Sequence, residues 1–374
     1  MAAQLKYTPV LRFRMEEKKV LTSFDFGNSI YPLVEIIKEV DRKPVTMRKG
    51  IPVVPKIIKK FEDVYCAALD KINSKKVFVD LPVHMPATKG TDKDVFAFLR
   101  TVVYNRATRT EYMIKLKPVS KKIIPVISTY FQLTGEANTI TLQEKDLRPH
   151  YPVLAFRTFP DKLLNDLTQI SRCVKASDYL IIDLDGYTAD PADEELEDLL
   201  ARLEDWNKCH VIILRPAMGA EITNVGLTHG QRVAGSDNSL LDNYPALHGD
   251  SFADYAGIKK DVVSDGGSVS PGFIFYDATE NDYYGYKGKP RITVPQKLEE
   301  YGKTIVPAVI ASPVAARMQA NGYSYLNGDN DGWQTILAIR RDPDSGRNAA
   351  KFKRISLLHY LHCMKEKITN GDFD

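Results

Sequence analysis

The stretch that decides the fold is Ser177-Asp-Tyr-Leu-Ile-Ile-Asp-Leu-Asp-Gly186. Its apolar run, Leu180 to Ile182, leads directly into two carboxylates, Asp183 and Asp185. A continuous apolar run bounded by polar residues is typical of a strand that is buried on both faces, as in a parallel sheet. Because side chains alternate along a strand, we expect both carboxylates to point to the same face at its carboxyl end. That end is where α/β proteins bind ligands or carry out chemistry.

Seven further runs have the same character, and helical patterns separate most of them. The eight predicted strands are 6–14, 30–37, 76–80, 123–127, 151–156, 180–183, 210–214 and 250–257. Repeated βα units of this kind form either an eight-stranded barrel or an open doubly wound sheet. No glycine-rich nucleotide-binding turn follows an early run, and we favour the barrel. The predicted fold class is α/β, a TIM-like (βα)₈ barrel in a single domain over 1–374.

The pattern changes after the eighth run. Two aromatic runs separated by a polar turn predict a β-hairpin within an excursion from the barrel over 262–290. A C-terminal helical segment is predicted over 303–368, with helices at 308–320 and 347–368. The glycine- and aspartate-rich stretch 328–333 is predicted to be a turn between them.

Composition narrows the class of protein. The 374 residues are 44% hydrophobic and 26% charged, and the formal net charge is only +3, which does not indicate a nucleic-acid-binding protein. The four cysteines form no CxxC pair, so the sequence favours a reducing compartment over a zinc ribbon or a disulfide framework. No apolar run has the length of a signal peptide or a membrane span. We therefore expect a soluble, cytoplasmic protein.

Two stretches near the start of the chain carry a family resemblance. Tyr7-Thr-Pro-Val-Leu-Arg-Phe-Arg14 with Glu17 after it, and then Ile30-Tyr-Pro-Leu-Val-Glu-Ile36, resemble the opening of the beta protein family, which is named for a T-even phage member and occurs in phages and bacteria. Further similarity follows in the same order at 180–185, 250–258 and 328–333. The resemblance implies a TIM-like barrel and a setting of phage–host conflict, such as antiviral defence. It supplies no catalytic residues.

Four carboxylates at predicted strand ends form the main candidate site: Glu35, Asp80, Asp183 and Asp185. In a barrel such residues line one mouth, where they can bind Mg²⁺ or Mn²⁺ or serve as a general acid and base. They can equally cap helices or form a structural ion-pair network.

Basic and aromatic residues extend the candidate ligand-binding set. Arg157 and Arg215 end the fifth and seventh runs and are available to neutralise the acids, while Asp254 and Tyr255 lie in the eighth run. The aromatic hairpin over 273–286 is predicted either to cover the mouth or to contact a protein partner. His84 follows the third run, and the sequence alone favours a surface position for it.

Two hypotheses for the function follow. The first is an accessory or recognition protein in phage–host conflict, which binds a partner or a small ligand at the C-terminal mouth of the barrel. The alternative is a divalent-metal-dependent hydrolase, acting on phosphodiesters through the strand-end carboxylates. The absence of a GxSxG motif and of a cysteine in an activating context argues against a nucleophilic serine or cysteine enzyme. Whether the protein is an enzyme at all stays open at this stage.

Overall fold

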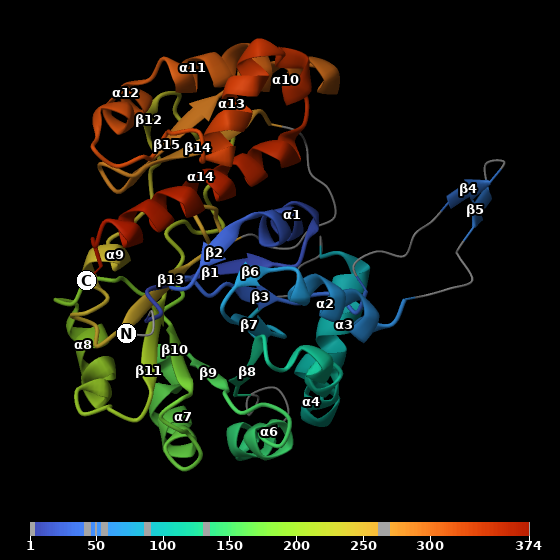
Figure 1. The fold of residues 1–374 in the computed structure, drawn as a ribbon, viewed down its shortest axis with the longest axis vertical. Coiled ribbons are helices and arrows are strands. Elements are labelled where there is room, and N and C mark those ends of the chain that lie inside the picture. Colours follow the sequence, from blue (N-terminus) through green and yellow to red (C-terminus); the bar gives the residue numbers. More distant parts are fainter. Residues whose placement is uncertain are drawn as a thin grey trace.

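The structure is a computed structural model, and it describes residues 4–40, 46–48, 51–53, 59–85, 91–129, 135–260 and 270–373. Figure 1 shows a barrel with helices around it and, packed on one side of the barrel, a second unit built from the C-terminal third of the chain. No helix in these ranges is long and apolar enough to cross a membrane.

The predicted barrel is confirmed, because eight parallel strands close on themselves in the order β1-β13-β11-β10-β9-β8-β7-β3. Each predicted run overlaps one of them. The barrel strands are β1 (Tyr7–Arg12), β3 (Leu33–Glu35), β7 (Val77–Asp80), β8 (Ile123–Ser128), β9 (Ala155–Thr158), β10 (Tyr179–Asp183), β11 (His210–Leu214) and β13 (Ser251–Asp254). The first strand closes the barrel by pairing with β3 on one side and β13 on the other.

Strand alternation divides the strand residues between two apolar clusters. One cluster fills the barrel interior and includes Val10, Leu33, Phe78, Ile181 and Ile212. The residues next to them in sequence point outward and pack against the surrounding helices. Both faces are therefore buried, which explains why the strands appear in the sequence as continuous apolar runs.

Helices cover the outside of the barrel. They are α1 (Met15–Ser23), α2 (Phe61–Asp70), α3 (Lys93–Val103), α4 (Arg106–Ile114), α6 (Thr139–Leu147), α7 (Leu163–Ile170), α8 (Glu194–Leu200) and α9 (Leu240–Asn243). Short polar side chains cap the N-termini of several of these helices. Asp92, for example, accepts hydrogen bonds from the backbone N–H groups of Asp94 and Val95, and α3 begins at the next residue. Two small sheets lie outside the barrel, formed by β2 (Asp25–Gly27) with β6 (Asn73–Ser74) and by β4 (Thr46–Arg48) with β5 (Ile51–Val53).

The C-terminal unit is a three-stranded antiparallel sheet with helices. The predicted hairpin is present as β14 (Gly272–Asp277) and β15 (Asp282–Lys287), and β12 (Gln231–Arg232) adds to its edge. Within the predicted excursion, 262–269 lie outside the described residues. The helices are α10 (Val294–Glu300), α11 (Val306–Ile310), α12 (Pro313–Ala320), α13 (Asp331–Arg341) and α14 (Ala349–Thr369), with a π-helical turn at Tyr301–Ile305 between α10 and α11.

Two local predictions in this unit need correction. The helix expected over 308–320 is divided in two, because Ser312 begins α12 by accepting a hydrogen bond from the N–H of Ala315. The turn expected over 328–333 ends early, because Asn330 accepts from the N–H of Trp333 and begins α13 at Asp331. In both places a polar residue that the sequence marks as a loop former is the N-cap of a helix.

The long helix α14 lies between the hairpin and the barrel (Figure 1). On one side Phe275 stacks on His359 with ring centroids 4.3 Å apart, and Tyr276 meets Tyr360 edge to face at 4.6 Å. On the other side Lys353 of α14 pairs with Glu17 of α1 at 2.8 Å. Most aromatic side chains of the hairpin are buried in this packing, and none lines the pocket described below. A protein partner at 273–286 stays a prediction.

Candidate functional site

Polar side chains replace apolar ones at the carboxyl end of the barrel interior. Glu35, Asp80 and Asp183 are the last residues of β3, β7 and β10, and Arg157 lies in β9. Each occupies an inward-facing position, two residues beyond an apolar residue of the interior cluster. All four side chains are at most 1% exposed.

Arg157 binds all three of these carboxylates. Its Nη1 donates to Glu35 Oε1 at 3.0 Å and to Asp80 Oδ2 at 2.9 Å. Its Nη2 and Nε donate to Asp183 Oδ2 at 2.6 and 3.2 Å. One guanidinium therefore ties together three strands that lie far apart in the sequence, an arrangement that suits the planar, five-donor geometry of arginine.

Two further arginines complete the network, and the sequence did not point to either. Arg12, the last residue of β1, donates from Nε to Glu35 Oε2 at 3.1 Å. Arg109, which is buried although it comes from α4, donates from Nη2 to Asp80 Oδ1 at 2.9 Å and to the carbonyl of Val126 at 3.2 Å. We call Arg12, Glu35, Asp80, Arg109, Arg157 and Asp183 the charge network. It pairs three carboxylates with three guanidiniums, so its formal charges balance.

The network keeps Glu35 and Asp183 ionised despite their burial. Burial by itself raises the pKa of Glu35, but the contact with His84 and the charges of Arg12 and Arg157 hold that pKa well below its usual range. Burial likewise opposes ionisation of Asp183, and Arg157 and then Lys260 lower its pKa overall. Buried charges are tolerated here because each has hydrogen-bonding partners of opposite sign.

His84 lies at the mouth and not on the surface, contrary to the sequence-based expectation. Its side chain is 8% exposed, and Nε2 lies 3.3 Å from Glu35 Oε1. Burial, and next the charge of Arg157, lower the pKa of His84, which favours the neutral ring. Nε2 also lies 3.4 Å from Arg157 Nη2, which can only donate a hydrogen bond, whereas the Glu35 carboxylate accepts one, so the two contacts call for opposite roles of Nε2. His84 Nδ1 has no hydrogen-bond partner among the described residues.

Tyr255 also faces the network, whereas its neighbour Asp254 faces outward. The Tyr255 hydroxyl lies 3.5 Å from both Arg157 Nη2 and Glu35 Oε1. Asp254 accepts hydrogen bonds from Tyr7 and from Tyr360 of α14, on the outer side of the barrel. Adjacent residues of a strand point to opposite faces, so only one of this predicted pair lies at the mouth.

Asp185 and Arg215 lie outside the charge network. Strand β10 ends at Asp183, and Asp185 follows in a left-handed turn with φ of 49°. Its side chain is 58% exposed and pairs with Lys260, so the same-face relation expected for Asp183 and Asp185 ends with the strand. Arg215 pairs with Asp237 at 2.9 Å and donates to the carbonyl of Tyr187 at 2.7 Å.

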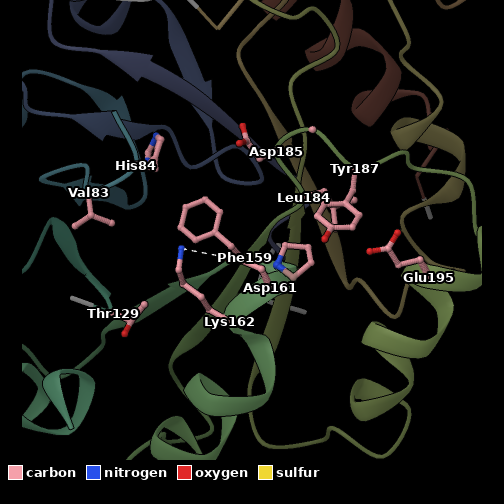
Figure 2. Close-up of a pocket in the computed structure, with 12 residues that line it drawn as sticks. Val83, His84, Thr129, Phe159, Asp161, Lys162, Leu184, Asp185, Tyr187 and Glu195 are labelled. Carbon is pink, nitrogen blue, oxygen red and sulfur yellow. Dashed lines mark ion pairs between the residues drawn. The ribbon is translucent and has the colours of Figure 1, made fainter. Parts of the chain in front are cut away.

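A pocket of about 710 Å³ opens at the same end of the barrel. Loops that follow β7, β8, β9 and β10 form its walls, with α8 on one side (Figure 2). Side chains that line this mouth pocket include His84, Thr129, Phe159, Asp161, Lys162, Asp185, Tyr187 and Glu195. Figure 2 shows His84 and Glu195 on opposite sides, with Phe159 between them. His84 thus belongs both to the pocket wall and to the contacts of Glu35.

A metal site at the network would have to compete with arginine. Ligand atoms of Glu35, Asp80 and His84 lie within 4.8 Å of one another, a spacing that suits a cation. However, the Arg157 guanidinium already contacts both of those carboxylates. Arg157 would repel a divalent ion at this position. The ion would also need the same carboxylate oxygens that now accept hydrogen bonds from Arg157. The predicted set Glu35, Asp80, Asp183 and Asp185 does not converge as four ligands, because Asp185 pairs with Lys260.

Comparison with known proteins gives one match. The sequence profile of the family described as beta protein matches residues 7–365, nearly the whole chain. No curated protein and no solved structure matches. The match covers every strand of the barrel together with the hairpin and nearly all of α14, and the chain therefore belongs to the beta protein family.

Proposed function

We propose that this protein is an accessory or recognition protein that binds a small ligand in the mouth pocket. The resemblance to a family of phages and bacteria suggests phage–host conflict as the setting. The observation that carries the proposal is the position of Arg157, whose guanidinium contacts all three strand-end carboxylates. Carboxylates held ionised and hydrogen-bonded by arginines are poorly suited to act as general acids or metal ligands.

The pocket supplies what a binding site needs. Ligand sites are concave, largely pre-formed and lined by apolar and aromatic groups with a few polar ones. The mouth pocket has this composition, with Phe159, Leu184 and Tyr187 beside charged residues. The charge network beneath it fixes the ends of β3, β7, β9 and β10, so the walls are held in place before a ligand arrives.

The test is a small-molecule screen by thermal shift on the wild type and on a variant with a filled pocket. Gly186 lines the pocket, and a Cβ there would meet no atom within 4 Å, so Gly186→Trp adds a large side chain without a backbone clash. Gly322→Trp is the matched control, because Gly322 is equally open and lies elsewhere. We expect ligands that stabilise the wild type and Gly322→Trp but not Gly186→Trp. If Gly186→Trp changes no interaction, the proposal fails.

A second candidate function is a divalent-metal-dependent hydrolase, which the grouping of Glu35, Asp80 and His84 favours. Magnesium or manganese would be its metal. Calorimetry with Mg²⁺ and Mn²⁺ on the wild type and on a Glu35→Gln/Asp80→Asn double variant tests it. Saturable micromolar binding that the double variant loses would support the hydrolase and justify assays on phosphodiesters. Since Arg157 occupies the carboxylates, we expect no saturable binding.

A further inference from the structure

Lysine side chains gather at the end of the barrel opposite to the mouth pocket. The two segments that lead into the neighbouring strands β7 and β8 are Asp70-Lys-Ile-Asn-Ser-Lys-Lys76 and Lys117-Pro-Val-Ser-Lys-Lys122. They hold six lysines and one carboxylate, so these two segments carry more positive charge than the whole chain, whose formal net charge is +3. We call the six lysines the lysine patch: Lys71, Lys75, Lys76, Lys117, Lys121 and Lys122.

The pairing of β7 with β8 brings the two segments together. The two strands pair from their first residues, so Lys76 and Lys122, which precede those residues, lie side by side at the strand spacing of about 5 Å. Lys76 Nζ donates to the carbonyl of Lys121 at 2.6 Å, and Lys122 Nζ donates to the carbonyl of Ser74. Helix α2 also contacts the 3₁₀ turn Lys117–Val119. The lysines therefore belong to one surface.

Ion pairs do not neutralise this surface. Within the part of the chain that the structure describes, no carboxylate lies within ion-pair distance of any of the six ammonium groups. By contrast, partly buried lysines elsewhere, such as Lys38, Lys260 and Lys353, pair with a carboxylate. Lys76 and Lys122 are also partly buried, but they donate to backbone carbonyls instead.

Repulsion between neighbouring ammonium groups destabilises this arrangement. Burial, and then the charge of Lys75, lower the pKa of Lys76. Burial also lowers the pKa of Lys122; the charge of Asp70 opposes this effect, and the charge of Lys76 adds to it. An anion that binds beside several like charges relieves their repulsion. The patch thus favours a ligand that carries several negative charges at close spacing.

We propose that the lysine patch binds the phosphate backbone of a double-stranded nucleic acid, independently of its sequence. A duplex carries one negative charge per about 1.7 Å of its axis, so it can contact several ammonium groups at once. The two segments contain no aromatic residue that could stack on the bases of a single strand. The large apolar side chains that the structure shows as exposed lie elsewhere, which disfavours insertion into a membrane surface.

The experiment measures binding of short fluorescent duplexes, one of DNA and one of RNA, to the whole chain by fluorescence anisotropy. At about 150 mM NaCl we expect a dissociation constant between roughly 1 and 100 µM, the range of sequence-independent binding. Affinity should fall steeply as the salt concentration rises, because each phosphate contact releases counterions. Duplexes of unrelated sequence should bind alike, and the tighter of DNA and RNA identifies the preferred backbone.

A triple variant, Lys75→Gln/Lys117→Gln/Lys121→Gln, removes three exposed charges of the patch. We expect it to bind the duplex at least about tenfold more weakly than the wild type. A plot of log K against log salt concentration should also become shallower by about two to three, because each lost phosphate contact removes about 0.9 from its slope.

The matched control is Lys93→Gln/Lys145→Gln/Lys289→Gln, which removes the same charge from exposed positions outside the patch. It should keep the wild-type slope and most of the affinity. Equal losses in both triple variants would mean that the effect comes from overall charge, and would overturn the inference.

Asp70→Asn tests the patch in the opposite direction. It removes the one carboxylate of the two segments, so it should tighten binding of the duplex about two- to threefold. Asp198→Asn, at an exposed position of α8, changes the net charge equally and should have a smaller effect. Equal gains in both variants would contradict a local effect of Asp70 and count against the patch.

Two further outcomes would overturn the inference. One is the absence of binding of either duplex at about 50 mM NaCl, where backbone contacts are strong. The other is binding of phosphatidylserine vesicles that depends on the patch, without binding of a duplex. Because this surface and the mouth pocket lie at opposite ends of the barrel, none of these results bears on the Gly186→Trp screen, and the two proposals can fail separately.

Discussion

At the scale of single residues, we expect the substitution of Arg157 to lower the stability of the protein the most. We expect Arg157→Met to lower the free energy of unfolding by about 3–5 kcal/mol, because Glu35, Asp80 and Asp183 would stay buried with fewer partners. Arg157→Lys should be intermediate, since one ammonium cannot replace a five-donor fork. Urea denaturation measures both.

Arg172→Met is the control for that measurement, because Arg172 is exposed and surface substitutions usually change stability by less than about 0.5 kcal/mol. If Arg157→Met were as stable as Arg172→Met, the three carboxylates would not depend on Arg157 for their stability.

A second residue, Asp166, gives stability a dependence on pH. Burial raises its pKa from 3.8 to about 6, against the opposing hydrogen bond that the Thr158 hydroxyl donates at 2.6 Å. At pH values between 3.8 and about 6, the Asp166 carboxyl is mostly protonated in the folded state and mostly ionised in the unfolded chain. The contribution of Asp166 is therefore fully present below pH 4 and is lost as pH rises through about 6.

We expect this loss to reach up to about 2–3 kcal/mol. Urea denaturation of the wild type and Asp166→Asn from pH 4 to 7.5 measures it, and the variant should gain stability relative to the wild type as pH rises. Asp198→Asn, at an exposed position of α8, should show no such trend. Parallel pH curves for the wild type and Asp166→Asn would contradict the assignment.

At the scale of elements, α13 and α14 approach closely at Gly332. A Cβ there would lie 2.6 Å from the backbone nitrogen of His359 and 2.7 Å from the carbonyl oxygen of Ile355. Because both atoms are backbone, the helices must separate to make room. Gly332→Ala should therefore lower the unfolding free energy by about 1–3 kcal/mol, although alanine is the better helix former.

Thermal denaturation of Gly332→Ala beside Gly322→Ala checks this. A Cβ at Gly322 meets nothing within 4 Å, so that variant should melt close to the wild type. A Gly332→Ala protein that melts at or above the wild-type temperature would show that the helices tolerate a wider spacing.

The same scale shows what the sequence predicts and what it does not. Strands with both faces buried stand out as apolar runs, and their last residues identify Glu35, Asp80 and Asp183. Arg109 escapes such reasoning, because a helix residue reaches the strand ends only through the tertiary packing of α4. The sequence wrongly groups Asp254 and Asp185 with the three strand-end carboxylates, because an apolar run does not show at which residue the strand ends or which of its residues face inward.

At the scale of the whole molecule, Asp254 links the barrel to the C-terminal unit. It accepts hydrogen bonds from Tyr7 of β1 and from Tyr360 of α14. Tyr7→Phe and Tyr360→Phe should each cost about 1–2 kcal/mol of unfolding free energy. Because both hydroxyls serve one carboxylate, their effects should not add, and the coupling should exceed about 0.5 kcal/mol.

A double-mutant cycle measured by chemical denaturation tests this link. The pair Tyr7→Phe with Tyr323→Phe serves as the control, since the Tyr323 hydroxyl donates to Asp372 and not to Asp254, and should be additive. Additivity for Tyr7 and Tyr360 as well would mean that Asp254 does not couple the two parts.

The way the barrel closes also constrains how the chain reaches this structure. Pro9 of β1 pairs with Asp254 of β13, so the first strand lacks one neighbour until the eighth has been synthesised. At roughly 5–20 residues per second, a ribosome takes on the order of ten seconds or more to cover that separation. During translation β1 presents an open edge, which invites pairing with other chains. We infer that nascent chains are most prone to aggregate in this interval, and that barrel closure is a late, slow step of folding.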